Sequence, residues 1–195
     1  AFKDFNVSIE KTEFKVVVPE NYQLRYKEFN MDNLLAVSSD GKNKTYSWTV
    51  ENMKAFDEEP YYDKLNKYVG AVYTAPTNFT YSGYSGKLDT WNDYAKWIAQ
   101  LNEGRDILSE ERILEIKELI KSITDDREIV KKLYTYMQQK TRYFNVSLGI
   151  GGLQPALARH VDEVGYGDCK GLSNYMKALL KVAGIESNYT LVLAG

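Results

Sequence analysis

The stretch VGYGDCKGLSNYMKALLKVAGIE (residues 164–186) runs from a glycine-containing loop into an apolar-striped helix. It also contains the single cysteine among the 195 residues. Asp168 is a favoured N-cap residue, so the sequence predicts a helix that begins at Cys169 and ends at Gly184. Gly167, just before the cap, permits a positive φ or the close approach of another segment. The predicted buried face consists of apolar residues at helical spacing, namely Leu172, Tyr175, Met176, Leu179, Leu180 and Ala183.

The position of Cys169 allows two interpretations. A cysteine at the first helical position lies near free backbone N–H groups and the positive end of the helix dipole, which stabilise a thiolate and can hold an oxyanion. This combination suits nucleophilic acyl transfer. A lone cysteine is also commonly a small apolar residue of the core, so the residues alone leave both roles open. After the helix, the apolar run in residues 187–195 predicts a buried strand, Tyr189–Leu193, beside it.

Residues 1–88 are predicted to form a β-rich domain that is incomplete at its N-terminus. Alternating apolar residues predict two half-buried strands, the second ending at Pro19. They are Phe5, Val7 and Ile9 in the first strand and Phe14, Val16 and Val18 in the second. The turn sequence SSDG (residues 38–41) precedes a predicted strand over residues 45–50, and residues 68–73 are a further candidate. These features indicate an antiparallel sandwich.

Helices are predicted from residue 89 onward, which gives the chain an α+β fold class. Thr90 and Asp93 fit a capping box, and Ser109 and Asp125 are further N-cap residues. Each cap is followed by an amphipathic stripe. The stripes are Tyr94, Trp97, Ile98 and Leu101; Ile113, Ile116, Ile120 and Ile123; and Ile129, Leu133 and Met137. Residues 89–195 are therefore predicted to form a second, helical domain.

Composition excludes several classes of function. The 25 Lys and Arg residues against 27 Asp and Glu residues give a net charge of -2 without charged blocks, which argues against a nucleic-acid partner. No apolar run approaches the ~20 residues of a membrane span. One cysteine and one histidine exclude an intrachain disulfide and a Cys/His zinc site. The loop Gly149-Ile150-Gly151-Gly152 lacks the third glycine of a dinucleotide fingerprint and is predicted to open no helix.

Two motifs resemble a known superfamily. The segment YGDCKGLSNYMKALLKVAGI (residues 166–185) and the loop LGIGGLQP (residues 148–155) resemble the amino-terminal half of the transglutaminase-like fold, a papain-related superfamily of cysteine enzymes. Upstream, TYSWTVENMKAFDEEP (residues 45–60) and LDTWNDYAKWIAQL (residues 88–101) are similar to the β-rich domain of unknown function that precedes bacterial members. The resemblance covers nearly the whole chain.

The resemblance assigns roles to individual residues. It places the nucleophile at Cys169, and it places the general-base histidine and an orienting Asp or Asn on two strands after the cysteine helix, so the chain is expected to be truncated before them. His160 lies nine residues before the cysteine in a predicted short solvent-facing helix and is interpreted as a surface residue. Asp168 is interpreted as a helix cap. Gln154 is either an oxyanion-hole residue or an ordinary loop residue before a proline.

Two functions remain open at this point. The first is a cysteine enzyme that acts on a protein or peptide amide through a thioester, resolved by water or by an amine, without a cofactor. The second is a non-catalytic module that binds peptide or glycan through the tyrosine-rich segments YYDKLNKYVGAVY (residues 61–73) and FTYSGYSG (residues 79–86). The family resemblance also implies a location outside the cytoplasm, either periplasmic or on the cell surface.

Overall fold

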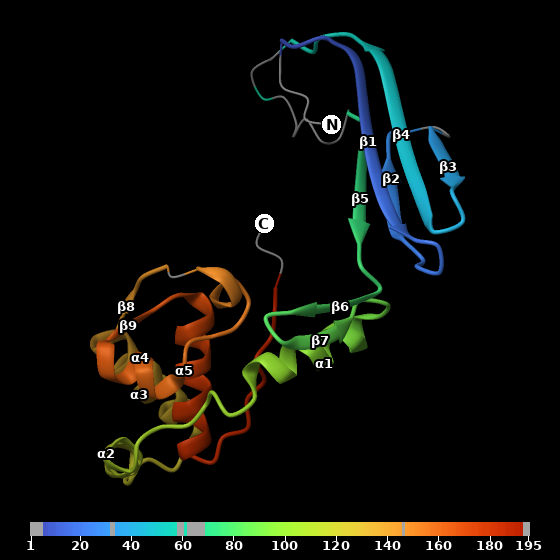
Figure 1. Ribbon diagram of the computed structural model, residues 1–195. Coiled ribbons are helices and arrows are strands. Elements are labelled where there is room, and N and C mark those ends of the chain that lie inside the picture. Colours follow the sequence, from blue (N-terminus) through green and yellow to red (C-terminus); the bar gives the residue numbers. More distant parts are fainter. Residues whose placement is uncertain (1–5, 32–33, 58–60, 62–68, 146, 193–195) are drawn as a thin grey trace. The chain divides into compact units, whose positions relative to one another are not determined.

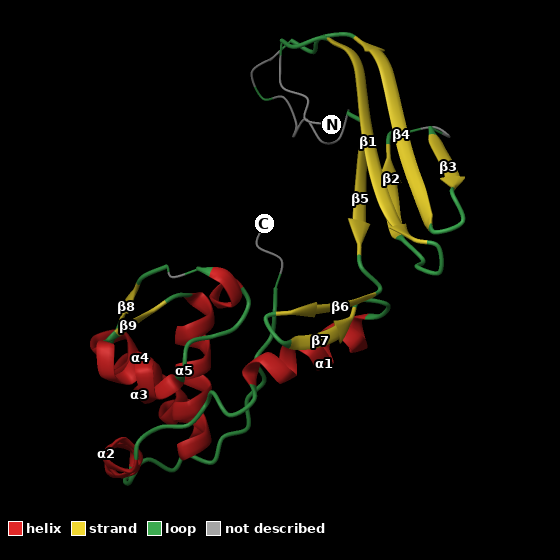
Figure 2. Cartoon of the chain, viewed as in Figure 1, coloured by secondary structure: helices red, strands yellow, loops and turns green. Residues whose placement is uncertain are grey.

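The structure is a computed structural model that describes residues 6–31, 34–57, 61, 69–145 and 147–192. The chain forms two compact units, residues 1–79 with 87–89 and residues 80–86 with 90–195. Strands predominate up to residue 87 and helices from residue 91 (Figures 1 and 2). All described strand pairs of the first unit are antiparallel. The α+β class predicted from the sequence is thereby confirmed.

The described residues of the first unit form two sheets. The larger has the order β1-β4-β3, and the smaller pairs β2 with β5. The strands are β1 (Ile9–Pro19), β2 (Arg25–Phe29), β3 (Leu35–Ser39), β4 (Asn43–Met53) and β5 (Ala71–Ala75). Trp48 of β4 is buried, and its Nε1 donates a hydrogen bond to Glu28 Oε1 of β2 at 2.6 Å. The Tyr26 ring meets the Trp48 ring edge-on at 5.4 Å, so aromatic contacts join the two sheets.

The prediction of two strands before Pro19 was wrong, because Ile9 and the residues of the second run lie together in the single strand β1, and Val7 lies before it. No glycine or proline interrupts residues 10–13, and the pairing with β4 runs from Ile9 opposite Met53 to Pro19 opposite Asn43. A long partner strand therefore extends the ladder through the polar residues. Two predicted strand residues, Phe5 and Tyr68, lie outside the described part of the chain.

The predicted turn between β3 and β4 is confirmed. Asp40 Oδ1 accepts hydrogen bonds from the backbone N–H groups of Lys42 at 2.8 Å and Asn43 at 2.7 Å, and Gly41 has a φ of 82°. The bonds from Asn43 and Lys42 lower the pKa of Asp40. The turn is therefore closed by a carboxylate that favours its charged form.

The second unit contains five α-helices among its described residues. They are α1 (Trp91–Asn102), α2 (Glu110–Ile120), α3 (Asp126–Lys140), α4 (Ala158–Val164) and α5 (Cys169–Val182). The predicted caps Thr90, Ser109 and Asp125 each accept a hydrogen bond from a backbone N–H group in the first turn of their helix. The short elements are β6 (Asn78–Tyr81), β7 (Tyr84–Lys87), β8 (Arg142–Tyr143), η2 (Gly149–Gly152) and β9 (Tyr166–Gly167). The glycines of η2 form a single 3₁₀ turn, and the next described α-helix begins only at Ala158.

Helix α5 is rotated relative to the predicted face. Its fully buried side chains include Tyr175 and Leu179, as predicted, but also the polar residue Asn174, which is 1% exposed. Asn174 Nδ2 donates hydrogen bonds to the backbone oxygens of Arg105 at 2.8 Å and Ala156 at 3.1 Å. Three predicted residues of the stripe, Leu172, Met176 and Leu180, are only partly buried against the core. One side of the predicted apolar stripe therefore remains available to line a cleft.

The strand predicted after α5 is not formed by the described residues. Residues 185–192 have no regular secondary structure, and residues 193–195 lie outside the described part of the chain. A strand requires a hydrogen-bonded neighbour, and no described segment pairs with residues 185–192. The apolar run alone predicted the extended character but could not supply a partner.

A buried carboxylate joins four helices of the second unit. Asp162 on α4 is 8% exposed and accepts hydrogen bonds from Tyr175 Oη of α5 at 2.6 Å and Arg112 Nε of α2 at 3.0 Å. Lys140 Nζ of α3 lies 3.0 Å from the same carboxylate. Arg112 also donates to Tyr136 Oη at 2.7 Å, which ties α2 to α3 a second time. Each of the four helices thus contributes at least one charged or polar group to the network.

The network shifts the pKa values of Asp162 and Tyr175 in opposite directions. Burial raises the pKa of Asp162, but the hydrogen bonds from Tyr175, Arg112 and Lys140 outweigh it, so the pKa is lowered overall. Burial, followed by the hydrogen bond to Asp162, raises the pKa of Tyr175 far above its ordinary value. At neutral pH the carboxylate is therefore charged and the phenol protonated, as the hydrogen bond between them requires.

Replacement of Asp162 by asparagine is predicted to destabilise the second unit by about 3 kcal/mol, because it leaves the half-buried Lys140 without its counterion and leaves Arg112 paired with Glu115 alone. The free energy of unfolding, measured by urea denaturation, provides the test. Glu163→Gln is the matched control, since Glu163 is exposed on the same helix. Equal stability of the two variants would show that the ion pairs do not hold the helices together.

Stability is also predicted to fall in acid through Asp162. Because its pKa is lower in the folded state than the ~3.9 of an unfolded chain, its stabilisation is complete above about pH 4 and is lost as the pH falls through the folded value. Denaturation curves from neutral pH to pH 3 should show a steeper loss in the wild type than in Asp162→Asn. Parallel pH profiles for the two proteins would contradict the assignment.

Candidate active site

A short parallel strand pair fixes the chain that enters α5. Strand β8 pairs with β9, and Arg142 N–H donates to the Gly165 oxygen at 3.0 Å while Phe144 N–H donates to the Gly167 oxygen at 2.9 Å. Gly165 ends α4 with a φ of 68°, a conformation that favours glycine. The two residues before the N-cap of α5 are therefore held on both sides, by α4 and by β8.

Gly167 lies close against neighbouring side chains. A Cβ atom at this position would lie 3.3 Å from Val161 Cγ2 and 3.5 Å from Leu172 Cδ2. Gly171, in the first turn of α5, would bring a Cβ within 3.4 Å of Val161 Cγ2. Of the two properties predicted for Gly167, close approach is therefore the one that the structure uses.

Asp168 is the N-cap of α5, as predicted. Its Oδ1 accepts a hydrogen bond from Gly171 N–H at 2.8 Å, and its other oxygen forms an ion pair with Lys170 Nζ. Among the described residues, the backbone N–H groups of Cys169 and Lys170 find no acceptor. The start of α5 thus keeps two free donors beside the cysteine, as expected for the first turn of a helix.

Cys169 is exposed and lines a cleft of about 510 Å³. Its placement at the first position of α5, outside the core, agrees with the predicted geometry. The cleft is bounded by α3, α5 and the segment after α5. The other lining residues are Tyr134, Met137, Leu172, Ser173, Met176, Lys177, Leu180, Ser187, Asn188, Tyr189 and Thr190. None of these residues is a histidine, aspartate or glutamate, so no conventional general base faces Cys169 in the described chain.

Tyr189 was not predicted as a site residue. Burial, and then the proximity of Cys169 and Asp168, raises the pKa of Tyr189. Its phenol therefore stays protonated at neutral pH and is available as a hydrogen-bond donor in the cleft. The sequence carried no signal for this role, because residues 187–192 were interpreted only as a buried strand.

The other predicted site residues lie away from Cys169. Gln154 Nε2 donates to Leu101 O at 3.0 Å and to Tyr84 Oη at 3.1 Å, which uses both of its amide hydrogens. An oxyanion role for Gln154 would require these bonds to be exchanged and stays a prediction. His160 is exposed on α4 and lines neither described cleft, as expected of a surface residue.

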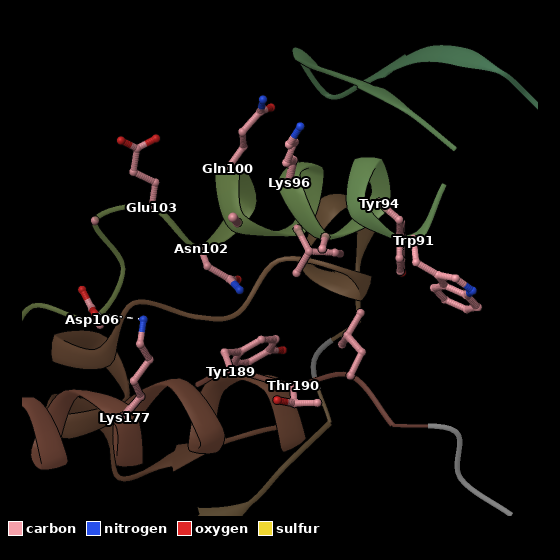
Figure 3. Close-up of a pocket in the computed structure, with 15 residues that line it drawn as sticks. Trp91, Tyr94, Lys96, Gln100, Asn102, Glu103, Asp106, Lys177, Tyr189 and Thr190 are labelled. Atoms are coloured by element: carbon pink, nitrogen blue, oxygen red, sulfur yellow. Dashed lines mark ion pairs between the residues drawn. The ribbon is translucent and has the colours of Figure 1, made fainter. Parts of the chain in front are cut away.

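A second cleft, of about 800 Å³, lies on the other side of Tyr189 (Figure 3). It is bounded by α1, by residues 103–106, by Lys177 of α5 and by residues 189–191. Lys177, Tyr189 and Thr190 line both clefts. The C-terminal segment therefore forms a shared wall between them.

Neither a metal site nor a membrane span is found in the described part of the chain. No group of three or more His, Cys, Asp or Glu side chains within these residues is arranged to hold a metal ion. Of the helices just described, none has both the length and the apolar character needed to cross a bilayer.

Comparison with known proteins gives two similarities. Residues 1–57 match the family "Domain of Unknown Function with solved-structure structure (DUF3857)". The crystal structure of a "putative protease" from Parabacteroides distasonis ATCC 8503 has a similar fold, with a TM-score of 0.61 and 15% sequence identity. The similarity covers 91% of this chain but 32% of that protein, so the chain spans about a third of its length. No curated protein gave a significant match.

The capping role of Asp168 yields a test. Asp168→Ala is predicted to destabilise the second unit by about 1 kcal/mol, because Gly171 N–H loses its acceptor. Amide hydrogen exchange at residues 170–172 should accelerate in parallel. Asp168→Asn is the control, because its side-chain oxygen preserves the cap while the ion pair with Lys170 is removed. A larger loss in Asp168→Asn than in Asp168→Ala would contradict the capping assignment.

Proposed function

We propose that the chain is part of a transglutaminase-like cysteine enzyme that acts on amide or peptide bonds, with Cys169 as its nucleophile. The observation that supports this proposal is the exposed position of Cys169 at the N-terminus of α5, inside a cleft and beside two free backbone N–H groups. The fold similarity to a "putative protease" agrees with it. The sandwich arrangement of residues 1–88 and the enzyme-like domain from residue 89 are part of the same proposal.

The proposed reaction has two steps. The Cys169 thiolate attacks the carbonyl carbon of the amide, the C–S bond forms, and the carbonyl oxygen takes the negative charge. In this proposal the free N–H groups of Cys169 and Lys170, at the start of α5, donate to that oxyanion. The C–N bond then breaks as the amine takes a proton from the protonated base, which leaves a thioester. Water or a second amine attacks the thioester and releases the thiolate.

The proton acceptor in this proposal comes from outside the described cleft. None of the residues that line the cleft with Cys169 is a histidine or a carboxylate, and His160 does not reach it. The resemblance places the histidine and its Asp or Asn partner after the cysteine helix. We therefore propose that sequence beyond residue 195 supplies them. A protein or peptide substrate and a location outside the cytoplasm are further proposals that rest on the resemblance.

The alternative of a tyrosine-rich binding module has less support. Tyr84 of the hairpin β6–β7 accepts the hydrogen bond from Gln154 and thus has a structural role. Tyr81 is exposed on the same hairpin, but most of the other proposed segment, residues 62–68, lies outside the described residues. Glycan binding by these segments therefore has no assembled site in the described chain.

The acyl-transfer step can be tested with p-nitrophenyl acetate. Because nitrophenolate leaves without protonation, acylation of Cys169 needs no general acid, whereas release of the acetyl group does need an activated water. We expect a burst of one equivalent of nitrophenolate, an acetyl group on Cys169 by mass spectrometry, and slow deacylation. Cys169→Ala should show no burst. Acetylation of the denatured chain but not of the folded chain would refute the proposal.

Peptide hydrolysis gives the complementary result. The 195-residue chain should not cleave peptide amides, because proton transfer by a base is typically worth 10²–10⁴-fold and no base lines the cleft. Fluorogenic peptides provide the assay. Turnover that disappears in Cys169→Ala would show that the chain contains its own base, and His160→Gln would then identify it.

A further inference from the structure

The cleft beside α1 has the dimensions of a ligand site. Its volume of about 800 Å³ falls within the range of about 300–1,000 Å³ common for such sites. Ile98, Ala95 and Ala99 of α1 and Leu191 of the C-terminal segment supply an apolar wall. Trp91, which is 86% exposed, stands at the mouth against Tyr94 (Figure 3). An exposed tryptophan beside an apolar hollow is a common anchor for a ligand.

One polar group in this cleft lacks a partner. Asn102 Oδ1 is buried and has no hydrogen-bond partner in the described chain. The side-chain amide extends from the end of α1 toward Tyr189 (Figure 3). A buried, unpaired acceptor is unfavourable by about 1–3 kcal/mol and calls for an explanation. As placed, this oxygen is closed off from the cleft, and rotation about the Cβ–Cγ bond, a broad torsion, brings it round to face a ligand.

The charged residues of the cleft, and Gln100, either point away from its interior or are already paired. Lys96, Gln100 and Glu103 point away from the hollow (Figure 3). Asp106 is bound by Lys177 Nζ at 3.2 Å and by Lys181 Nζ at 3.1 Å. The interior therefore offers an apolar surface with an amide group, and its charges are already paired. Such a site favours an uncharged ligand that carries both a donor and an acceptor.

This cleft is the neighbour of the cleft that contains Cys169. Lys177, Tyr189 and Thr190 line both clefts. A ligand on the α1 side therefore lies against the segment that also borders the thiol's cleft.

We propose that the cleft between α1 and residues 189–191 binds the substrate polypeptide next to the bond attacked by Cys169, with Asn102 recognising a backbone peptide group. This inference rests on the role proposed for Cys169. A peptide group presents one N–H and one C=O, which match the Oδ1 and Nδ2 of an asparagine side chain. An apolar side chain of the same polypeptide fills the space against Ile98 and Trp91. A sugar ring, in contrast, would leave the apolar wall of Ile98, Ala95 and Ala99 without a matching surface.

Two alkylating agents separate binding from thiol reactivity. Iodoacetamide reports the reactivity of Cys169 alone, whereas acetyl-Ala-Leu-Ala chloromethyl ketone, which loses chloride to the Cys169 Sγ, reports reactivity and peptide binding together. Each rate constant is first normalised to that of a blocked cysteine peptide. The rate constant for the chloromethyl ketone divided by that for iodoacetamide is then expected to be about ten. Asn102→Leu should lower this ratio by about threefold to tenfold, as for the loss of a hydrogen bond. Asn92→Leu is the matched control, because Asn92 is exposed on α1 and does not line the cleft.

Methylation of the peptide tests the same bond from the ligand side. Each backbone amide of the peptide reagent is methylated in turn. In the wild type, methylation of one of these amides should lower the rate ratio as much as Asn102→Leu does. In Asn102→Leu, the same methylation should cause no further fall. An equal ratio for wild type and Asn102→Leu, with iodoacetamide still reacting at Cys169, would overturn the inference but leave the proposed function intact. Faster alkylation of Cys169 by N-chloroacetyl chitobiose than by the peptide reagent, lost in Asn102→Leu, would overturn the assignment of a polypeptide ligand.

Peptide binding can also be measured without the thiol. In Cys169→Ala, acetyl-Ala-Leu-Ala-amide should shift the NMR resonances of the Asn102 side-chain amide and the Trp91 indole. No shift at millimolar peptide would overturn the inference. A shift in Cys169→Ala together with a wild-type thiol that resists both alkylating agents would support the site and refute the nucleophile.

Discussion

The buried carboxylate of Asp162 is the interaction on which the helical unit depends. It lies on the short helix α4 and binds groups from α2, α3 and α5, so that four segments, from Arg112 to Tyr175 along the chain, meet at two oxygen atoms. A seven-residue helix such as α4 is too short to be stable alone. Its position therefore depends on tertiary contacts, of which the ion pairs with Arg112 and Lys140 are the most directional.

The position of Cys169 follows from the same constraint. Helix α4 ends at Gly165, three residues before the N-cap Asp168, and Val161 of α4 packs against Gly167 and Gly171. Asp162, next to Val161, thereby fixes both the end of α4 and, through Tyr175, the direction of α5. The cysteine lies where these constraints converge, at the start of a helix whose first N–H groups remain free. A precisely held helix N-terminus is what electrostatic stabilisation of an oxyanion requires.

Local features were readable from the sequence, and long-range ones were not. The caps Thr90, Ser109, Asp125 and Asp168 were predicted because their chemistry involves residues only three positions apart. The alternation in β1 gave the strand but not its length, because the length is set by pairing with β4. The rotation of α5, which buries Asn174, depends on carbonyl groups of distant loops.

The cleft residues illustrate the same limit. Asn102 has no distinguishing sequence context, and its unpaired oxygen is visible only once α1 has been placed beside residues 189–191. Tyr189 likewise acquires its place beside Cys169 through tertiary structure. The cysteine itself was identified because its position relative to an N-cap is a local property. Its exposure, in contrast, depended on how the surrounding loop packs.

The most direct test of the central claim is the rate at which iodoacetamide alkylates Cys169 in the folded chain at neutral pH. A nucleophile at the start of α5, exposed in a cleft beside free backbone N–H groups, should react faster than a blocked cysteine peptide under the same conditions. Mass spectrometry of the native and the urea-denatured chain gives both rates. A thiol that reacts only after denaturation would contradict the account and assign Cys169 to packing.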